Sequence, residues 1–347
     1  MAEHSAKFYL RCASGGYDLI LKRGSLANLH SFTDTVGRRV LIAAGSRVPE
    51  ALVQSVLAQC PEGAVCRLPA GEKGSGMAGV QNVLDALCNM GAGSRDLVAA
   101  LGGQSVQSTA ALAAAIYQGG VALAACPAST AAQLCACGGA KGVPLQRPGC
   151  YAGVSKAPAL VLVDPALTES EPPAQKAAGL AWALQPALTS DPKLLALLEE
   201  EKPEYDEILW RTLQNKKSLL DGPSAGQAVL GCGMELAQVL WQMYGCRGRR
   251  TKGLLPGECL ALALEALIED KTLAKRVRAV CRTLGLPARA VWNREKAAEM
   301  LWQSPARNGD VLPLVSITGP GCWKLEQLHE EEVRRKLGAQ TRKEKEA

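Results

Sequence analysis

The sequence is poor in aromatic residues and nearly devoid of histidine. Phe, Trp and Tyr make up 4% of its 347 residues, and only two of them are phenylalanine. Small apolar side chains must therefore fill most of the interior, which favours close contact between helices and a sheet. The three histidines, His4, His30 and His329, lie towards the two ends of the chain.

A long apolar run and a strong net charge are also missing. The richest apolar segments, such as 110–116, are dominated by alanine and are too short to cross a bilayer. The formal net charge is +6, and the basic residues are dispersed except in clusters at 247–252 and 334–345. No aromatic residues alternate with these clusters and no known nucleic-acid module accompanies them, so nucleic-acid binding is not expected.

The sequence shows neither a secretory signal nor a disulfide framework. The residues that follow Met1 lack the apolar core of a signal peptide. The thirteen cysteines are odd in number and irregular in spacing, and most lie in apolar runs, where a free thiol behaves as a small hydrophobic group. We expect a reducing compartment, the cytosol first, with an organelle left open if the chain is a processed form.

Strand and helix patterns divide the chain near residue 165. Short apolar strands alternate with helices in the first half, which predicts a mostly parallel sheet covered on both faces. After Asp164-Pro165 the periodicity is helical, apart from one short strand at 311–317 and a charged helix at 325–337. The predicted fold class is an α/β domain over 1–165 followed by an all-α domain over 166–347. The expected strands are 7–11, 18–22, 40–44, 64–68, 97–101, 121–125 and 160–163, and the expected helices are 50–59, 78–90, 108–117, 173–188, 192–200, 205–220, 226–244, 256–269, 273–284 and 294–303.

The stretch 98–143 has the frame of a nucleotide-binding site. A buried strand runs into the paired glycines Gly102 and Gly103, and a small-residue helix follows. Glycines after a strand allow the backbone to approach a phosphate and leave amide groups free to donate to it. The acidic residue expected after such a turn is replaced by Ser108. The frame is thus kept while its charged side chain is lost.

The order of motifs along nearly the whole chain resembles the 3-dehydroquinate synthase family of sugar-phosphate cyclases. No single motif is decisive, but many of them in the right order make a chance match improbable. The resemblance implies a Rossmann-like α/β domain followed by an all-helical domain. The segments that carry it are Tyr17-Asp-Leu-Ile-Leu-Lys-Arg-Gly-Ser-Leu26, Pro69-Ala-Gly-Glu-Lys73, Arg95-Asp-Leu-Val-Ala-Ala-Leu-Gly-Gly103, Pro127-Ala-Ser-Thr-Ala-Ala-Gln133, Gly179-Leu-Ala181, Gly257-Glu258 and Val311-Leu-Pro313.

The resemblance also implies which residues should hold a metal. Members of the family bind a divalent ion, usually zinc, through one glutamate and two histidines, and NAD transiently oxidises the substrate before phosphate leaves and the ring closes. The corresponding positions here are Trp182, Met234 and Pro256. Tryptophan and proline offer no donor atom, and a thioether is a soft, weak ligand unsuited to catalytic zinc. No metal site is therefore expected at these positions.

Other functional positions of the family are changed as well, and a few persist. Lys141, Arg147 and Glu258 are the remaining candidates for catalytic positions, although none is expected to act. Glu72, Gly102, Gly103 and Gly119 are weak candidates for binding a cofactor. No cofactor is expected; residual NAD binding is left open, and zinc is not expected.

These replacements favour a degenerate family member that has kept the fold and lost the reaction. A buried charged site costs stability unless its charges are paired, so relaxed selection lets neutral groups replace it. We expect a structural or interaction subunit with a protein partner or as a homodimer. The alternative is a divergent, active 3-dehydroquinate synthase or related cyclase with a rebuilt site. A further alternative is a new thiol site formed by Cys135, Cys137, Cys232 and Cys259.

Overall fold

The structure is a computed structural model that describes most of the chain in two compact units. It covers residues 5–12, 14–69, 74–138, 140–145, 150–222, 228–245, 253–288 and 292–338. Within these limits unit 1 comprises residues 5–145 and 151–171, and unit 2 comprises residues 150 and 172–338. Each unit is described by itself.

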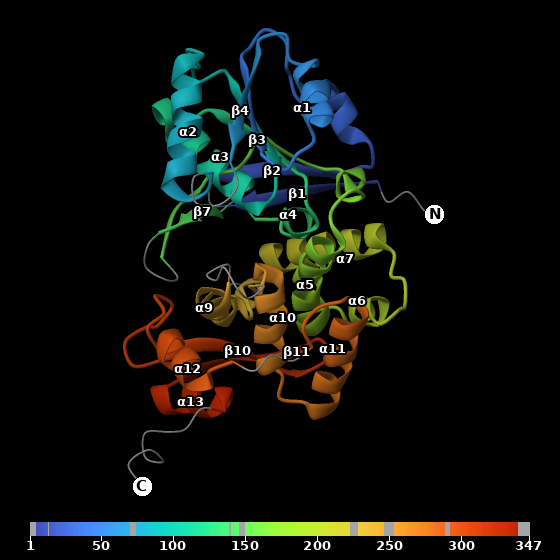
Figure 1. The fold of residues 1–347 in the computed structure, drawn as a ribbon, viewed down its shortest axis with the longest axis vertical. Coiled ribbons are helices and arrows are strands. Elements are labelled where there is room, and N and C mark those ends of the chain that lie inside the picture. Colours follow the sequence, from blue (N-terminus) through green and yellow to red (C-terminus); the bar gives the residue numbers. More distant parts are fainter. Residues whose placement is uncertain are drawn as a thin grey trace. The chain divides into compact units, whose positions relative to one another are not determined.

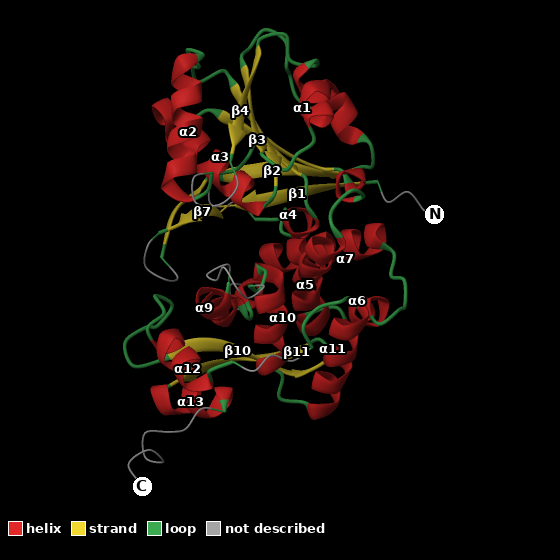
Figure 2. Cartoon of the chain, viewed as in Figure 1, coloured by secondary structure: helices red, strands yellow, loops and turns green. Residues whose placement is uncertain are grey.

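Unit 1 is built on a seven-stranded sheet with the strand order β1-β2-β9-β6-β5-β3-β4 (Figure 2). Every neighbouring pair is parallel except β1 and β2, so the mostly parallel sheet predicted from the sequence is confirmed. The strands are β1 (Ala6–Cys12), β2 (Gly15–Leu21), β3 (Val40–Gly45), β4 (Gly63–Leu68), β5 (Leu97–Gly102), β6 (Ala122–Pro127) and β9 (Leu160–Val163).

Helices cover both faces of this sheet (Figure 1). Adjacent residues of β3 point to opposite sides: Leu41 packs with α2 and α3, whereas Ile42 packs with η1 and α1. Because both faces are buried, the central strands are apolar throughout instead of alternating with polar residues. The helices of unit 1 are η1 (Ser25–Ser31), α1 (Glu50–Leu57), α2 (Gly76–Asn89), α3 (Gln104–Ile116), η2 (Tyr117–Gly119), α4 (Thr130–Leu134) and η3 (Pro165–Thr168).

Two features of unit 1 differ from the sequence prediction. Helix α3 begins at Gln104, four residues before the predicted start, because its first turn, Gln-Ser-Val-Gln, has little apolar periodicity. An antiparallel hairpin of β7 (Ala140–Pro144) and β8 (Tyr151–Ser155) was not predicted. This hairpin packs against α3, and such a contact between distant segments leaves no local pattern.

The division between the units falls after Glu171, six residues beyond the predicted boundary at 165/166. The carboxylate of Glu171 accepts hydrogen bonds from the backbone nitrogen and the hydroxyl of Thr130, at 2.9 and 2.6 Å. The chain after β9 therefore remains attached to α4 of unit 1 until this residue. The proline pair Pro172-Pro173 then opens the first helix of unit 2.

Unit 2 is helical with one two-stranded hairpin. Its helices are α5 (Pro173–Thr189), α6 (Pro192–Leu198), α7 (Tyr205–Asp221), η4 (Val229–Gly231), α9 (Met234–Tyr244), α10 (Pro256–Ala266), α11 (Lys271–Thr283), α12 (Arg294–Trp302) and α13 (Glu330–Leu337), and the hairpin pairs β10 (Leu312–Gly319) with β11 (Cys322–Leu328). Among the described residues, no helix has both the length and the apolar character needed to traverse a bilayer.

The sequence prediction for unit 2 was wrong at two places. Residues 325–328 belong to strand β11, so the C-terminal helix begins only at Glu330. The helix expected over 226–244 is interrupted at Gly233, whose φ of +78° is left-handed, and α9 starts at the next residue. A Cβ at Gly233 would also lie 2.9 Å from the Cδ2 atom of Leu264, so the turn before α9 requires glycine for two reasons.

Candidate functional site

In unit 1, the candidate site is the turn between β5 and α3. Gly103 is the residue before the first turn of α3, and no side chain caps this helix end. The first amide groups of a helix have no partners within the helix and carry partial positive charge. The turn therefore presents unpaired N–H donors of the kind that bind a pyrophosphate.

Side chains in the first turns of α3 contact the backbone of this turn and fix its conformation. Gln107 is 7% exposed, and its amide nitrogen donates to the carbonyl oxygens of Ala100 and Gly102 at 2.8 and 3.2 Å. A Cβ on Gly102 would lie 2.8 Å from the Cγ2 atom of Val106, and one on Gly45 would lie 3.0 Å from the same atom. Both glycines therefore lie directly against Val106, and a side chain at Gly102 would overlap it.

A pocket of about 180 Å³ adjoins the first turns of α3. Its wall includes Gln104 and Ser108 from α3, Pro127 from the end of β6, Ala132 from α4 and Lys156 from the segment before β9. Ser108 occupies the position expected for an acid, so this part of the wall presents a hydroxyl group instead of a carboxylate. The pocket can accept a polar group but offers no carboxylate from this position to hold ribose hydroxyls.

The other candidate residues from the sequence are not gathered at this turn. Glu72 and Arg147 lie outside the described residues, and only the backbone of Lys141, in β7, is described. Gly119 precedes the amino end of β6, whereas Gly102 and Gly103 follow the carboxyl end of β5. Because β5 and β6 are parallel and pair from Leu97↔Ala122 to Gly102↔Pro127, Gly119 lies at the opposite end of the sheet. The expectation that it shares a cofactor site with the other two glycines is therefore wrong.

In unit 2, the three positions where the resemblance expects metal ligands lie on segments that pack together. Helix α5, which carries Trp182, contacts α10, which Pro256 opens, and α10 contacts α9, which begins at Met234. The approach of α5 and α10 is close, since a Cβ on Gly257 would lie 1.7 Å from the carbonyl oxygen of Ala178.

Hydrogen bonds also tie α5 to the segment before α9. The amide nitrogen of Gln185 donates to the carbonyl oxygens of Leu230 and Cys232 at 2.8 and 2.9 Å. The carboxylate of Glu258, a candidate catalytic position, accepts from the backbone nitrogen of Leu255 at 2.7 Å and so caps its own helix. The backbone frame of a shared site is therefore present in unit 2.

The side chains at the three positions are not deeply buried, since Pro256 is exposed and Met234 is partly exposed. Trp182 is half-buried and its ring faces Lys216 of α7, whose ammonium nitrogen lies 6.0 Å from the ring centroid. Lys216 is only 6% exposed. The sequence did not predict its burial, because a lone lysine in an amphipathic helix is usually exposed to solvent. The Oε1 atom of Gln238, one turn after Met234, is buried and has no hydrogen-bond partner among the described residues.

The four cysteines of the alternative thiol site are divided between the two units. Cys135 and Cys137 lie in unit 1, and Cys232 and Cys259 lie in unit 2. Burial raises the pKa of both the Cys232 and the Cys259 thiol to about 12, so these two remain protonated at neutral pH. Within the described part of the chain, no group of three or more His, Cys, Asp or Glu side chains is placed to hold a metal ion.

Comparisons with known proteins support the resemblance seen in the sequence. Residues 65–178 match the sequence model of a family described as 3-dehydroquinate synthase N-terminal. No curated protein sequence matches the chain.

Solved structures of similar fold cover nearly the whole chain. One is a 2-deoxy-scyllo-inosose synthase in complex with carbaglucose-6-phosphate, NAD⁺ and Co²⁺, at 17% identity and a TM-score of 0.78, over 96% of this chain and 99% of that one. Another is the 2-epi-5-epi-valiolone synthase of Streptomyces hygroscopicus with NAD⁺ and Zn²⁺, at 21% identity and a TM-score of 0.79, over 92% and 95%. A probable glycerol dehydrogenase from Sinorhizobium meliloti is less similar, at 17% identity and a TM-score of 0.64, over 94% and 97%. At these identities the likeness establishes the fold.

These structures correct one expectation from the sequence. No cofactor was expected from the residue types at the site positions, with residual NAD binding left open and zinc not expected, yet two structures of this fold hold NAD⁺ together with Co²⁺ or Zn²⁺. The expectation gave too much weight to side chains. A pyrophosphate is bound largely by backbone amides, and the glycine turn of unit 1 still presents them.

Proposed function

From the resemblance to the 3-dehydroquinate synthase family, which the match over residues 65–178 and the cyclase fold support, we propose that this chain is a catalytically inactive relative of the sugar-phosphate cyclases. It has kept the family's two-unit fold and serves as a structural or interaction subunit, with a protein partner or as a homodimer. Its function is then to bind a partner through its surface and not to catalyse ring closure of a sugar phosphate.

The observation that carries this proposal is the set of side chains at the packed junction of α5, α9 and α10. Trp182, Met234 and Pro256 come from three segments that meet in unit 2, as a shared site would require. The donor set does not fit a catalytic divalent ion, because indole and pyrrolidine rings offer no ligand atom and the thioether is a poor ligand for a hard or borderline cation. Without polarisation of the substrate's oxygens at this junction, the family's elimination step has no activating group.

The glycine turn of unit 1 is suited to binding a nucleotide, in contrast to the junction of unit 2, which is not suited to binding a metal. We propose that it binds the pyrophosphate of NAD through the first amide groups of α3, with Gln107 and Val106 holding the turn in shape. Bound NAD would supply reversible hydride transfer in an active relative. Here its binding would stabilise unit 1, because a ligand that binds only the folded state shifts the folding equilibrium.

Replacing Gly103 by aspartate tests the nucleotide site. The φ of Gly103 is −74°, so a side chain is allowed there, and aspartate is a favourable residue at a helix N-cap. Its carboxylate would occupy the phosphate position and repel it. We expect titration calorimetry to show NAD binding to the natural chain and at least about tenfold weaker binding to Gly103→Asp, without loss of thermal stability.

Pro49→Asp is the matched control, because it adds the same charge at the N-cap of α1, which also lacks a side-chain cap. Its NAD affinity should equal that of the natural chain. Absence of binding to the natural chain, or equal binding to Gly103→Asp, would show that the turn is not a nucleotide site.

Turnover tests the loss of the reaction. The chain is incubated with the family's open-chain sugar-acid phosphate, NAD and either Zn²⁺ or Co²⁺, and phosphate release is measured beside an active 3-dehydroquinate synthase. We expect release no faster than in the enzyme-free mixture, because nothing at the junction activates the elimination. Release well above this background, together with about one tightly held divalent ion per chain, would instead establish a divergent active enzyme with a rebuilt site.

A further inference from the structure

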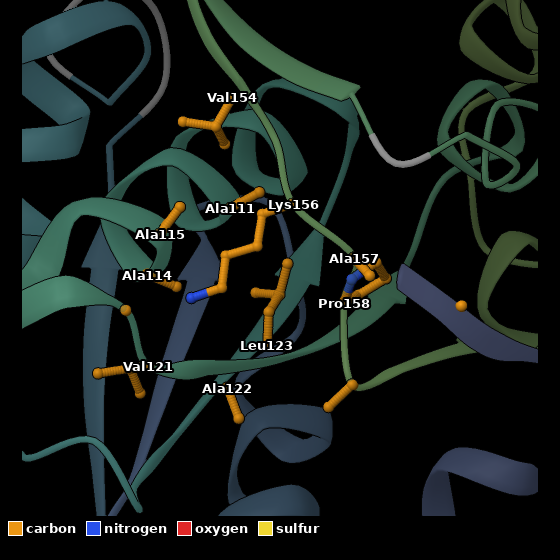
Figure 3. A pocket seen from close by; sticks show the side chains of 13 residues that line it. Ala111, Ala114, Ala115, Val121, Ala122, Leu123, Val154, Lys156, Ala157 and Pro158 are labelled. Carbon is orange, nitrogen blue, oxygen red and sulfur yellow. The ribbon is translucent and has the colours of Figure 1, made fainter. Parts of the chain in front are cut away.

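A second pocket of unit 1 lies beside the amino end of β6 and shares Leu123, Lys156 and Pro158 with the pocket at the first turns of α3. It has a volume of about 290 Å³ and is lined by the last turns of α3, the start of β6 and the segment before β9. Ala111, Ala114 and Ala115 form one wall, and Val121 and Leu123 form another (Figure 3). Small side chains on both walls leave a space that larger residues at the same positions would fill.

The charged group in this pocket is the ammonium of Lys156. Figure 3 shows its side chain extending among the alanines, with the nitrogen towards the end of α3. Lys156 is half-buried and forms no hydrogen bond or ion pair with the described residues. The ammonium keeps part of its surface in water, and the pocket leaves room beside it for a counter-ion.

The backbone opposite Lys156 is shaped to admit the ammonium. A Cβ on Gly120 would lie 2.0 Å from the Lys156 Nζ atom, so the nitrogen lies directly against the backbone of this glycine. The turn reaches this position through three successive residues with positive φ: Gln118 at 45°, Gly119 at 81° and Gly120 at 118°. Such a conformation is unusual for glutamine and is retained only where the surroundings require it.

The nearby helix end limits the charge of any ligand. Ala115 lies in the last turn of α3, and its carbonyl oxygen lies 3.5 Å from the Cβ position of Gly120. The C-terminal end of a helix carries partial negative charge, which offsets part of the lysine charge and disfavours a dianion. Phosphate groups are usually held by several donors, by arginine or by helix N-termini. One ammonium in an apolar space instead suits a monoanion with a short hydrocarbon part.

We propose that this pocket binds a small aliphatic monocarboxylate, whose carboxylate pairs with Lys156 and whose hydrocarbon part contacts the alanine wall. The site adjoins the pocket at the first turns of α3, with which it shares Lys156. It gives the chain a metabolite-binding activity that needs neither NAD nor a metal.

Butyrate is the probe, and titration of the whole chain by calorimetry is the measurement. We expect a dissociation constant on the order of 1 mM for so small a ligand. Lys156→Met, which keeps the length of the side chain and removes its charge, should weaken binding by at least about tenfold. Lys7→Met is the matched control, because Lys7 is exposed on β1 and pairs with Asp18 away from the pocket. It should bind butyrate like the natural chain.

Butyramide and inorganic phosphate test whether binding requires both the negative charge and the hydrocarbon part of butyrate. Both should bind at least about tenfold more weakly than butyrate, since one lacks the charge and the other is a dianion without a hydrocarbon part. An NMR signal from isotopically dimethylated Lys156 should also shift when butyrate is added, a readout that does not depend on a variant folding. If butyrate fails to bind, or binds Lys156→Met equally well, Lys156 merely pairs with the end of α3 and the proposal is wrong.

Discussion

Replacing Gly257 by alanine is expected to destabilise unit 2 by about 3 kcal/mol or more, although glycine-to-alanine changes inside helices usually stabilise by up to about 1 kcal/mol. The new Cβ would lie 1.7 Å from the Ala178 carbonyl oxygen and 2.6 Å from its carbonyl carbon. Both are backbone atoms of α5, so no rotamer change relieves the overlap. Helices α5 and α10 must separate, and the packing of the junction is then lost along their contact.

The measurement is denaturant unfolding followed by circular dichroism, and the control is Gly231→Ala. Gly231 is exposed, nothing lies within 4 Å of its Cβ position, and its φ is not in the left-handed region. The control should change stability by less than about 0.5 kcal/mol. Equal stability of the two variants would mean that α5 and α10 do not approach as closely as the structure indicates.

Asp164→Ala should have the second large effect, a loss of about 3–5 kcal/mol from unit 1. Asp164 is 2% exposed at the end of β9. Its carboxylate accepts from the backbone nitrogens of Gly24, Leu26 and Ala166 at 2.8, 3.1 and 3.1 Å. Alanine would leave the three amide groups without this acceptor, the buried one of Leu26 among them, and the turn before η1 would lose its attachment to the sheet.

Two variants make this prediction specific. Asp164→Asn keeps the shape and one acceptor oxygen, so its loss should fall between those of the natural chain and Asp164→Ala. Asp85→Ala removes an exposed carboxylate that accepts only from Gln81 in the same helix, and it should cost less than about 0.5 kcal/mol. Thermal unfolding of the three variants checks the order. A loss for Asp164→Ala no greater than for Asp85→Ala would contradict it.

The strands of unit 1 could be predicted because each is a short apolar run bounded by turn residues. Leu160–Val163 was predicted to the residue, and Val40–Gly45 and Leu97–Gly102 to within one residue. Segments stabilised by distant contacts were missed, namely the β7–β8 hairpin and strand β11. The interruption of the predicted helix at Gly233 was also missed. A glycine within a helical pattern of apolar residues is compatible with a continuous helix unless its φ is known to be positive.

The candidate sites also include features that the sequence predicted and features that depend on distant contacts. The sequence identified the glycine turn and the three replaced positions, because residue types at ordered motifs can be compared without coordinates. It did not single out Lys216 or Lys156. Lysine is usually exposed, and only the packing of α5 against α7, or of β6 against α3, determines which lysine is drawn inside.

Residue chemistry along the chain was sufficient to decide the α/β-then-helical order, the residue types at positions 182, 234 and 256, and the glycines at 102 and 103. These follow from short-range periodicity and from the atoms that each side chain carries. Three-dimensional packing alone decided that Gly119 lies away from Gly102 and Gly103, that α5 and α10 touch at Gly257, and that the Lys156 ammonium enters an alanine-lined pocket. Strand direction, helix approach and burial arise from contacts between residues far apart in the chain, and no local pattern encodes them.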